Sequence, residues 1–478
     1  MVSDPSTEKK YAINSEIEFT DREIRILKKC TRKIDLRVLP IVIILYICSL
    51  IDRSNIGAAI VNGLVTELKL SPVEEKNVTA IFYVFYILCE TPSNILLKKF
   101  KPHVWFAIIG SGWSLTCIGL AFAHTGALFI VLRSILGALE AGLMPGVVGY
   151  LSYWYSRKEL GFRMTLFFMA VPISGIIGSP IAGALASLKI GMLKSYQCIF
   201  FFEGIATLII CIASYFLVQD YPDKVGFFTE EERSLVLCRL NSELGMASKS
   251  RISLKQTIKA FMDWKIWVFA LMFFGVTNGF IVVSIFSPTL VKSLGYSSIK
   301  ATYLAIIPSI GGFIGMVIVL NLIGKVKYWI LLVVFSLTIV LGYTVTAFGK
   351  GKILRLVFLG VAGLGANGIT PIALSWMNIN QGGIYKGMVA SAFVVSVGSI
   401  AGVVSPTFYV AKYGPKYTYG SIFTICVSLM MTVLTIILVL YFKYENDRRD
   451  KNPVDVSYLT EDEQRELNDL HPQFRYIY

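Results

Sequence analysis

Apolar residues in this chain gather into stretches of about twenty, separated by shorter polar connections. An α-helix rises about 1.5 Å per residue, so about twenty apolar residues cross the roughly 30 Å hydrocarbon core of a bilayer. We therefore expect an all-α polytopic membrane protein with twelve transmembrane helices. The expected spans are residues 38–60, 77–97, 104–124, 127–150, 164–187, 197–218, 264–291, 300–323, 328–348, 353–376, 385–411 and 418–442.

The longest polar segment inside this series divides the spans into six and six. Short connections on the side of both tails are rich in lysine and arginine, which favours the cytoplasm for that side. Two six-helix halves with a substrate site at their interface are a common plan for transporters. The expected parts are a cytoplasmic N-terminal tail (1–37), an N-terminal six-helix bundle (38–218), a cytoplasmic central loop (219–263), a C-terminal six-helix bundle (264–442) and a cytoplasmic C-terminal tail (443–478).

Two helices are also expected outside the spans. Apolar residues from Thr20 to Leu27, and Ile34 further on, are spaced helically among basic residues, which predicts either an amphipathic helix on the cytoplasmic leaflet or a solvated basic tail. In the central loop, Thr229 followed by three glutamates is typical of a helix start, because a capping hydroxyl and acidic side chains stabilise the first turn.

The composition supports a membrane protein and excludes several other classes. The chain is 55% hydrophobic and 16% charged, whereas soluble proteins have about 25% charged residues. The net charge of +14 belongs to loops and tails, so it does not indicate nucleic-acid binding. Eight scattered cysteines without a CxxC pair and three separated histidines predict neither a disulfide framework nor a metal site. No nucleophile–base pair or phosphate loop supports an enzyme, and no cofactor is expected.

Six charged side chains lie inside the expected spans of the first half: Asp52, Arg53, Glu90, Arg133, Glu140 and Glu203. The expected spans of the second half have none away from their edges. A charge at bilayer depth costs from about 3 to over 10 kcal/mol by different estimates, so such residues are usually functional. For Glu90 and Glu203, near span ends, we expect structural ion pairs. For Asp52 and Glu140, two carboxylates at different depths, we expect proton-coupling sites, since a carrier must load on one side and unload on the other.

The depths of these charges predict their partners. Asp52 and Arg133 both lie roughly 21 Å above the inner edge of the hydrocarbon. Asp52 and Arg53 point about 100° apart around a helix. We therefore expect Arg133 to be the charge partner of Asp52, while Arg53 points into a cavity as a fork-shaped contact for a carboxylate. Aromatic and amide residues would complete the substrate site, with Tyr86, Asn278, Asn367 and Asn378 as candidates.

Several motifs resemble one transporter family. The motifs are Asp52-Arg53-Ser54-Asn55, Thr91-Pro92-Ser93-Asn94, Phe202-Glu203-Gly204, the pattern of Arg133, Gly137 and Glu140, and the pattern of Trp376, Asn380 and Gly383. Together they are similar to the anion:cation symporter family of the major facilitator superfamily, in its fungal allantoate permease branch. The likeness extends over about residues 30–478. Two places depart from it: lysines 98, 99 and 101 replace an Asp-Arg pair, and Gly398-Ser399 replaces Gly-Asn.

This resemblance implies the major facilitator fold and a carboxylate-bearing substrate carried with protons, such as a vitamin or a nitrogen or sulfur source. It implies Asp52 and Glu140 as protonation sites, Arg53 as the anion contact, Arg133 as the residue that tunes the acids, and Tyr86 as a substrate contact.

We therefore expect a proton-coupled secondary active transporter that imports a small organic anion by alternating access. Its partners would be that anion, protons and the lipid bilayer, without nucleic acid, and the protein would be a monomer in the plasma membrane. The endoplasmic reticulum or vacuolar membrane is an alternative location. A nutrient sensor that does not transport, and a proton-independent exchanger or efflux carrier, are the alternative functions.

Overall fold

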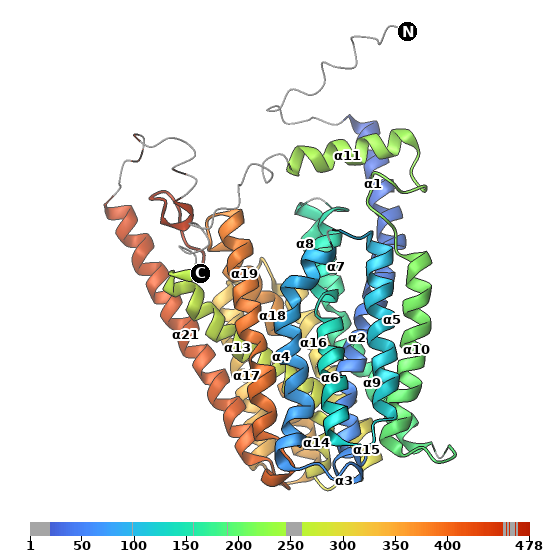
Figure 1. Cartoon of the computed structure of the whole chain (residues 1–478). Helices are drawn as coiled ribbons and strands as arrows, with labels where there is room; N and C mark the ends of the chain where they lie inside the picture. Colours follow the sequence, from blue (N-terminus) through green and yellow to red (C-terminus); the bar gives the residue numbers. More distant parts are fainter. Residues whose placement is uncertain are drawn as a thin grey trace.

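A computed structural model describes residues 20–97, 99–155, 157–188, 190–244, 261–452, 456, 458, 464 and 467–478. Every regular element in these ranges is a helix, apart from one isolated bridge between Ile323 and Val326. Most helices run roughly side by side through one bundle (Figure 1). The predicted all-α architecture is confirmed.

The spanning helices agree with the apolar stretches to within a few residues at most of their ends. Eleven helical segments in the described ranges are long and apolar enough to cross a membrane. A further long helix, α4, is more polar and packs along α6. The helices of the first half are α2 (Leu39–Val61), α3 (Leu64–Glu67), α4 (Pro72–Leu97), α5 (Pro102–Ala121), α6 (Gly126–Glu140), α7 (Leu143–Ser152), α8 (Arg157–Phe168), α9 (Ala170–Ser187) and α10 (Ser195–Leu217).

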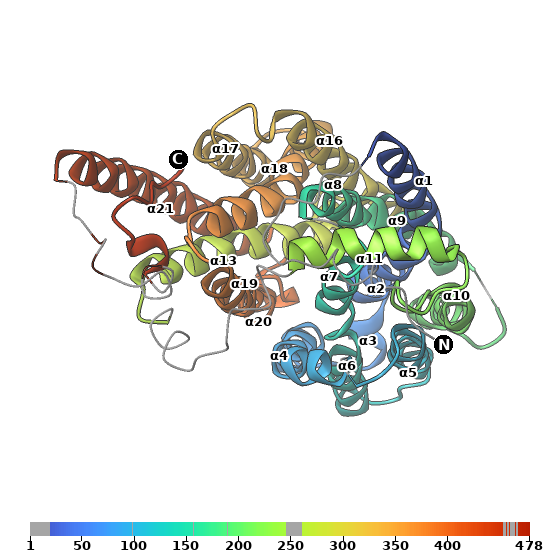
Figure 2. The same cartoon turned by 90° about the horizontal axis from the view of Figure 1, so that it is seen from above.

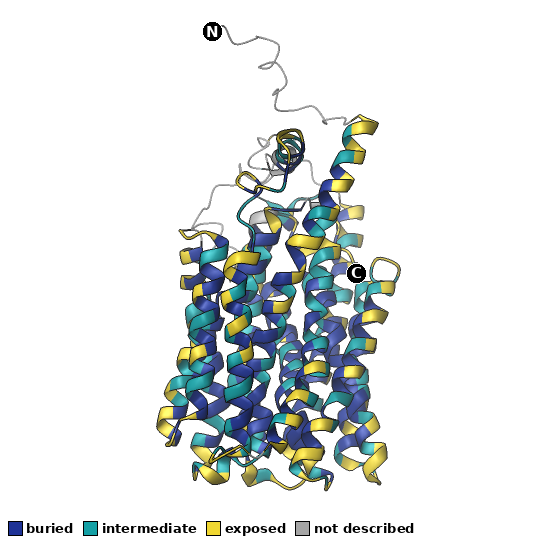
Figure 3. Ribbon diagram, turned by 90° about the vertical axis from the view of Figure 1, so that its right-hand side faces the viewer, coloured by how far each residue is buried: buried dark blue, intermediate teal, exposed yellow. Residues whose placement is uncertain are grey.

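In the second half, single residues interrupt several of the spans, as between α13 and α14, α15 and α16, and α19 and α20. Its helices are α13 (Trp264–Ile285), α14 (Ser287–Ser293), α15 (Ser298–Leu304), α16 (Ile306–Leu322), α17 (Tyr328–Phe348), α18 (Lys352–Ile379), α19 (Ile384–Ser399), α20 (Ala401–Val404), η2 (Ser405–Phe408), η3 (Ala411–Tyr413) and α21 (Thr418–Lys451). Exposed residues, among them large apolar ones such as Leu88, Ile209 and Phe216, lie on the outer faces of the bundle (Figure 3). This is the surface that a spanning helix presents to lipid.

The two halves are joined most closely at one end, where α3, α14 and α15 lie (Figure 1). Asn62 Nδ2 donates to Thr302 Oγ1 at 2.9 Å, and Lys292 Nζ donates to the Val61 carbonyl at 3.0 Å. On the other side of the interface, Glu75 Oε1 accepts from the Ala411 amide at 2.8 Å. All hydrogen bonds that link described residues of the two halves are at this end, which we call the joined end.

The opposite end carries α1 (Asp21–Arg37) and α11 (Glu230–Leu244), and we call it the tail end. α1 begins at Thr20 with a capping box to Glu23, as its sequence predicts. It rises in line with α2 instead of lying flat across a leaflet, which corrects its predicted orientation (Figure 1). The reason is a protein partner: α1 packs on α11, and Lys33 Nζ donates to Glu232 Oε1 at 2.7 Å. α11 begins directly after Thr229, as expected.

The last twelve residues fold back onto the tail end of the second half. Asp469, in η4 (Asn468–Leu470), forms ion pairs with Lys386 of α19 at 2.6 Å and Lys265 of α13 at 2.9 Å. Ile477 accepts a hydrogen bond from Trp376 Nε1 of α18 at 2.8 Å, and its amide donates to Asn380 Oδ1 at 2.8 Å. This C-terminal segment, residues 467–478, therefore ties together the ends of three spanning helices.

Candidate functional site

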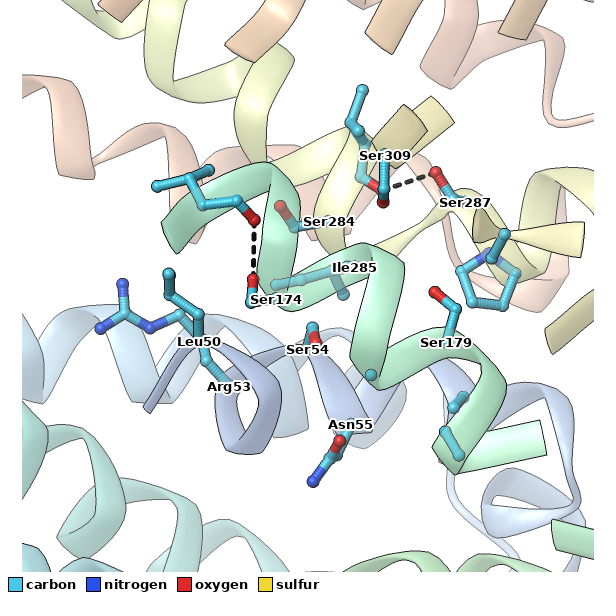
Figure 4. Close-up of a pocket in the computed structure, with 18 of the residues that line it drawn as sticks. Leu50, Arg53, Ser54, Asn55, Ser174, Ser179, Ser284, Ile285, Ser287 and Ser309 are labelled. Carbon is cyan, nitrogen blue, oxygen red and sulfur yellow. Dashed lines mark hydrogen bonds between the residues drawn. The ribbon is translucent and has the colours of Figure 1, made fainter. Parts of the chain in front are cut away.

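A narrow cavity lies between the two halves (Figure 4) and extends toward the joined end, where Pro288 and Thr302 line it. α2 contributes Arg53, Ser54 and Asn55, and α9 lies beside it with Ser174 and Ser179. Helices α13, α14, α16 and α18 also contribute to the wall, with Ser284, Ser287, Ser309 and Asn367. The cavity volume is about 40 Å³. This is room for a few water molecules, so the cavity is closed tighter than an organic substrate needs.

A buried ion pair lies at the wall of this cavity. Arg53 Nη2 lies 3.2 Å and Arg53 Nε 3.4 Å from Glu140 Oε2, which also accepts from Ser49 Oγ at 2.9 Å. Glu140 is fully buried, whereas Arg53 reaches the cavity. Glu140 Oε1 has no hydrogen-bond partner among the described residues. The pair thus joins a cavity-lining cation to a carboxylate on α6.

Two aromatic rings hold the guanidinium of Arg53 from its other sides. Its central carbon lies 4.7 Å from the ring centroid of Tyr86 and 5.1 Å from that of Phe82. A guanidinium over an aromatic face is attracted by the ring quadrupole, and more strongly when both are removed from water. Tyr86 thus supports Arg53 directly, but it is buried and does not line the cavity.

Asp52 faces away from this arrangement. Its Oδ2 accepts from Trp113 Nε1 of α5 at 3.2 Å, and its Oδ1 lies 3.7 Å from Cys117 Sγ. The divergence of Asp52 and Arg53 is as expected, but the predicted contact between Asp52 and Arg133 is wrong. Equal depth does not fix the rotation of a helix, and α2 is turned so that Asp52 faces α5.

Arg133 has other neighbours. Its Nε donates to the Val78 carbonyl of α4 at 3.1 Å, and its guanidinium lies 5.1 Å from the Phe82 ring centroid. Neither of its terminal nitrogens has a hydrogen-bond partner within the part of the chain that the structure describes. Arg133 and Arg53 therefore share one aromatic ring, Phe82.

The ion pairs predicted for Glu90 and Glu203 are not formed with any described residue. Glu203 is buried on α10, and neither of its oxygens has a hydrogen-bond partner there. α10 packs on α5, which has no lysine or arginine, and on α2, whose Arg53 turns to Glu140 instead. Glu90 is on α4, which packs on α6, and the one basic residue of α6, Arg133, contacts α4 at the distant Val78 instead.

The three candidate asparagines lie in different places, and one of them lines the cavity. Asn367 lines the cavity, and its Oδ1 has no partner among the described groups. Asn278 is fully buried, and its Oδ1 accepts from Ser405 Oγ at 2.7 Å, a contact between α13 and η2. Asn378 is exposed near the end of α18 and accepts from Ser391 Oγ at 2.8 Å. Asn278 and Asn378 thus do not line the cavity, because helix rotation and depth turn them elsewhere.

Several site residues did not come from the sequence reasoning. Ser49 and Phe82 each lie four residues before a predicted site residue, Arg53 and Tyr86, and residues four apart share a helix face. That spacing is a signal that could have found them. The serines of α9 and α16 have no comparable signal, since they are small polar residues in apolar helices. No group of three or more metal-ligating side chains lies together in the described ranges.

Comparison with known proteins identifies the family. The model of the Major Facilitator Superfamily matches residues 42–406. A putative tartrate transporter of Agrobacterium vitis is 29% identical over 429 residues, which cover 87% of this chain and 92% of the relative. An uncharacterized transporter of Schizosaccharomyces pombe is 29% identical over 428 residues, covering 89% of this chain and 86% of the relative.

Solved structures share the fold. A bacterial homolog of the human lysosomal transporter Spinster, in an inward-facing and occupied conformation, has a TM-score of 0.61 at 14% identity, covering 84% of this chain and 95% of that one. A D-xylose-proton symporter has a TM-score of 0.61 at 15% identity, covering 81% of this chain and 96% of that one. This chain therefore belongs to the Major Facilitator Superfamily, and it is a multi-pass membrane transporter and not an enzyme.

Proposed function

We propose that this protein is a proton-coupled importer of a small organic anion that works by alternating access, as a member of the anion:cation symporter family in its fungal allantoate permease branch. The observation that carries the proposal is the buried pair of Arg53 and Glu140 at the wall of a cavity between the two halves. The likeness to a putative tartrate transporter adds support for a carboxylate substrate.

The pair suggests how a proton and an anion bind together. While Glu140 is ionised, it neutralises Arg53, and a substrate carboxylate would have to compete with it. A proton on Glu140 removes that negative charge and leaves the guanidinium of Arg53 for the substrate carboxylate. Separating a buried pair without a replacement charge is costly, so proton and anion are each favoured by the presence of the other.

The remaining candidates have supporting roles in this proposal. Asp52, buried against Trp113, is a second proton site. Tyr86 orients Arg53, and Arg133 raises the positive potential around Glu140. Asn367, which lines the cavity, contacts the substrate. Asn278 and Asn378 lie outside the cavity in this conformation, so they would reach substrate only after a rearrangement.

The orientation completes the proposal. With the tail end in the cytoplasm, as the basic loops favour, the joined end is the outer one. The protein would then be closed toward the outside in this conformation. We propose the plasma membrane as the location, since an importer of nutrients acts there, and a monomer as the working unit.

Uptake of labelled carboxylates tests the proposal. Cells lacking their own carriers would express the full chain and receive tartrate, nicotinate, pantothenate, biotin, allantoate or cysteine at acidic external pH, with and without a protonophore. We expect uptake of one compound that collapses with the protonophore. We also expect Glu140→Gln to abolish its dependence on external pH, because the amide cannot exchange a proton.

Other outcomes would redirect the proposal. Uptake that ignores both the protonophore and Glu140→Gln would contradict proton coupling and favour exchange or efflux. No uptake of any compound, with the protein shown at the cell surface, would favour a sensor. A Ser49→Ala variant is the matched control, because it removes a hydrogen bond to Glu140 but leaves the titratable group in place.

A further inference from the structure

A second cavity lies outside the bundle, where α1, α8 and α11 meet at the tail end. Its volume is about 440 Å³. Its wall carries four basic side chains and two acidic ones: Lys28, Arg32, Arg163, Arg239, Asp35 and Glu159. We propose that this recess binds the phosphate-bearing headgroup of an anionic membrane lipid. The proposal does not depend on which substrate the protein carries.

The charges in the recess do not balance. Arg163 donates twice to Asp35, at 2.9 and 3.0 Å, and Arg239 Nη1 donates to Glu159 Oε1 at 3.1 Å. These pairs account for both acids. Lys28 and Arg32 are exposed and form no ion pair with any residue that the structure describes. Two positive charges therefore remain at the mouth of the recess, and they match a phosphate group.

The position of the recess favours a lipid over a dissolved phosphate. Leu36, one helical turn from Arg32, has 68% of its surface exposed, and Phe162, the neighbour of Arg163, has 61%. Such apolar side chains at the edge of a spanning bundle contact hydrocarbon. Arg32 and Lys28 lie roughly 6 and 12 Å further along α1, which is the headgroup level, where basic side chains attract anionic lipids.

The residues around the recess can contact both the charged headgroup and the apolar acyl chains of a lipid. α1 stands at the periphery of the molecule when it is viewed from the tail end (Figure 2). The wall of the recess also includes Ile24 and Leu27, so apolar side chains lie beside the cations. A headgroup phosphate would contact Lys28 and Arg32, while its acyl chains continue along Leu36 and Phe162 into the bilayer.

The helix itself offers a matched control. Arg25 and Lys29 are exposed on α1 but do not line the recess. Two double variants remove the same charge from the same helix: one is Lys28→Gln with Arg32→Gln, and the other is Arg25→Gln with Lys29→Gln. General attraction of a basic helix to an anionic surface would fall equally in both variants, whereas a site would be lost in the first pair alone.

The experiment uses the full chain purified in an uncharged detergent. Dioctanoyl phosphatidic acid would be titrated while the thermal unfolding midpoint is followed, with dioctanoyl phosphatidylcholine and inorganic phosphate as separate arms. We expect phosphatidic acid to raise the midpoint of the wild type and of the control variant. We expect the half-saturating concentration to rise about 30-fold in the Lys28 and Arg32 variant, the loss expected for two surface cations.

Three results would overturn the proposal. One is no shift with phosphatidic acid. The second is equal weakening in both variants, which would indicate a diffuse attraction. The third is an equal shift with inorganic phosphate at the same concentration, which would assign the recess to a soluble anion. The unfolding midpoint without lipid shows whether each variant is folded, and the exposed positions of all four residues make normal folding the expectation.

Discussion

Arg53 is held between one carboxylate and two aromatic rings, and this geometry depends on the shape of its side chain as much as on its charge. Two of its nitrogens reach Glu140 Oε2, and its plane lies near Tyr86 and Phe82. A lysine carries the same charge but has a single ammonium group, which neither forks around a carboxylate nor stacks on a ring. Charge and shape can therefore be separated by substitution.

We predict that Arg53→Lys lowers uptake at low substrate concentration by about tenfold or more, the equivalent of about 1.4 kcal/mol. Tyr86→Phe should change uptake little, because it keeps the ring that faces the guanidinium. The measurement is the initial rate at several substrate concentrations, normalised to protein at the cell surface. Equal rates for Arg53→Lys and wild type would mean that the charge alone suffices.

At the scale of single residues, the sequence predicted which charged side chains are buried, but not which of them contact one another. The spacing of Asp52 and Arg53 correctly required them to diverge. Counting residues from the span edges placed Asp52 level with Arg133, but it carried no information on the rotation of α2. The structure brings Arg53 to Glu140 and Asp52 to Trp113. Rotation is set by packing against several helices at once, which a single span does not encode.

At the scale of elements, the short C-terminal segment, residues 467–478, holds the ends of spanning helices together. Asp469 is buried between Lys265 and Lys386, and Tyr476 donates a hydrogen bond to its Oδ2 at 2.8 Å. Asp263 also contacts both lysines. Burial alone would raise the pKa of Asp469, but the two lysines outweigh it and hold the pKa below its usual range.

We predict that Asp469→Asn destabilises the purified protein by about 3 kcal/mol, the lower part of the range for breaking a buried pair, since Asp263 still faces the lysines. Asp450→Asn is the control, because its pair with Arg475 is exposed. A thermal or denaturant unfolding series compares the two. Equal stability of wild type and Asp469→Asn would show that the segment does not hold the helix ends.

The same group predicts a dependence on pH. A carboxyl whose pKa is lower in the folded than in the unfolded protein contributes stability above its unfolded pKa of about 3.9, and the contribution is lost as pH falls through the folded pKa. The stability difference between wild type and Asp469→Asn should thus be constant from about pH 7 to pH 5 and shrink below about pH 4. A difference that grows on acidification would contradict this assignment.

The sequence predicted the elements better than their junctions. Apolar length placed most helix ends within a few residues, although α21 continues to Lys451, nine residues past its predicted end. The docking of the C-terminal segment was not foreseen, because its partners on α13, α18 and α19 are distant in the sequence. Trp376 and Asn380 had nonetheless stood out as a motif, and both bind Ile477.

For the whole molecule, the division into two sets of spans follows from the sequence, but the closed end does not. The conformation depends on small free-energy differences between packings of the same helices. In this structure the halves meet most closely where glycine lets backbones approach. A Cβ atom on Gly57 of α2 would lie 1.8 Å from the carbonyl oxygen of Ile285, at the end of α13. Because that neighbour is backbone, no side-chain rotation relieves the clash.

We therefore predict that Gly57→Ala opens the joined end and lowers uptake by about tenfold or more, since a loss of about 1.4 kcal/mol in closure already shifts the equilibrium tenfold. Spin labels at Thr66→Cys on α3 and Lys300→Cys on α15, with the exposed Cys426 replaced by serine, report the separation of the halves. The distance should lengthen in Gly57→Ala.

Gly149→Ala is the control, because a Cβ atom there meets nothing within 4 Å. An unchanged distance together with normal uptake would show that the halves close without this contact, whereas a longer distance with lost uptake would tie transport to closure of this end.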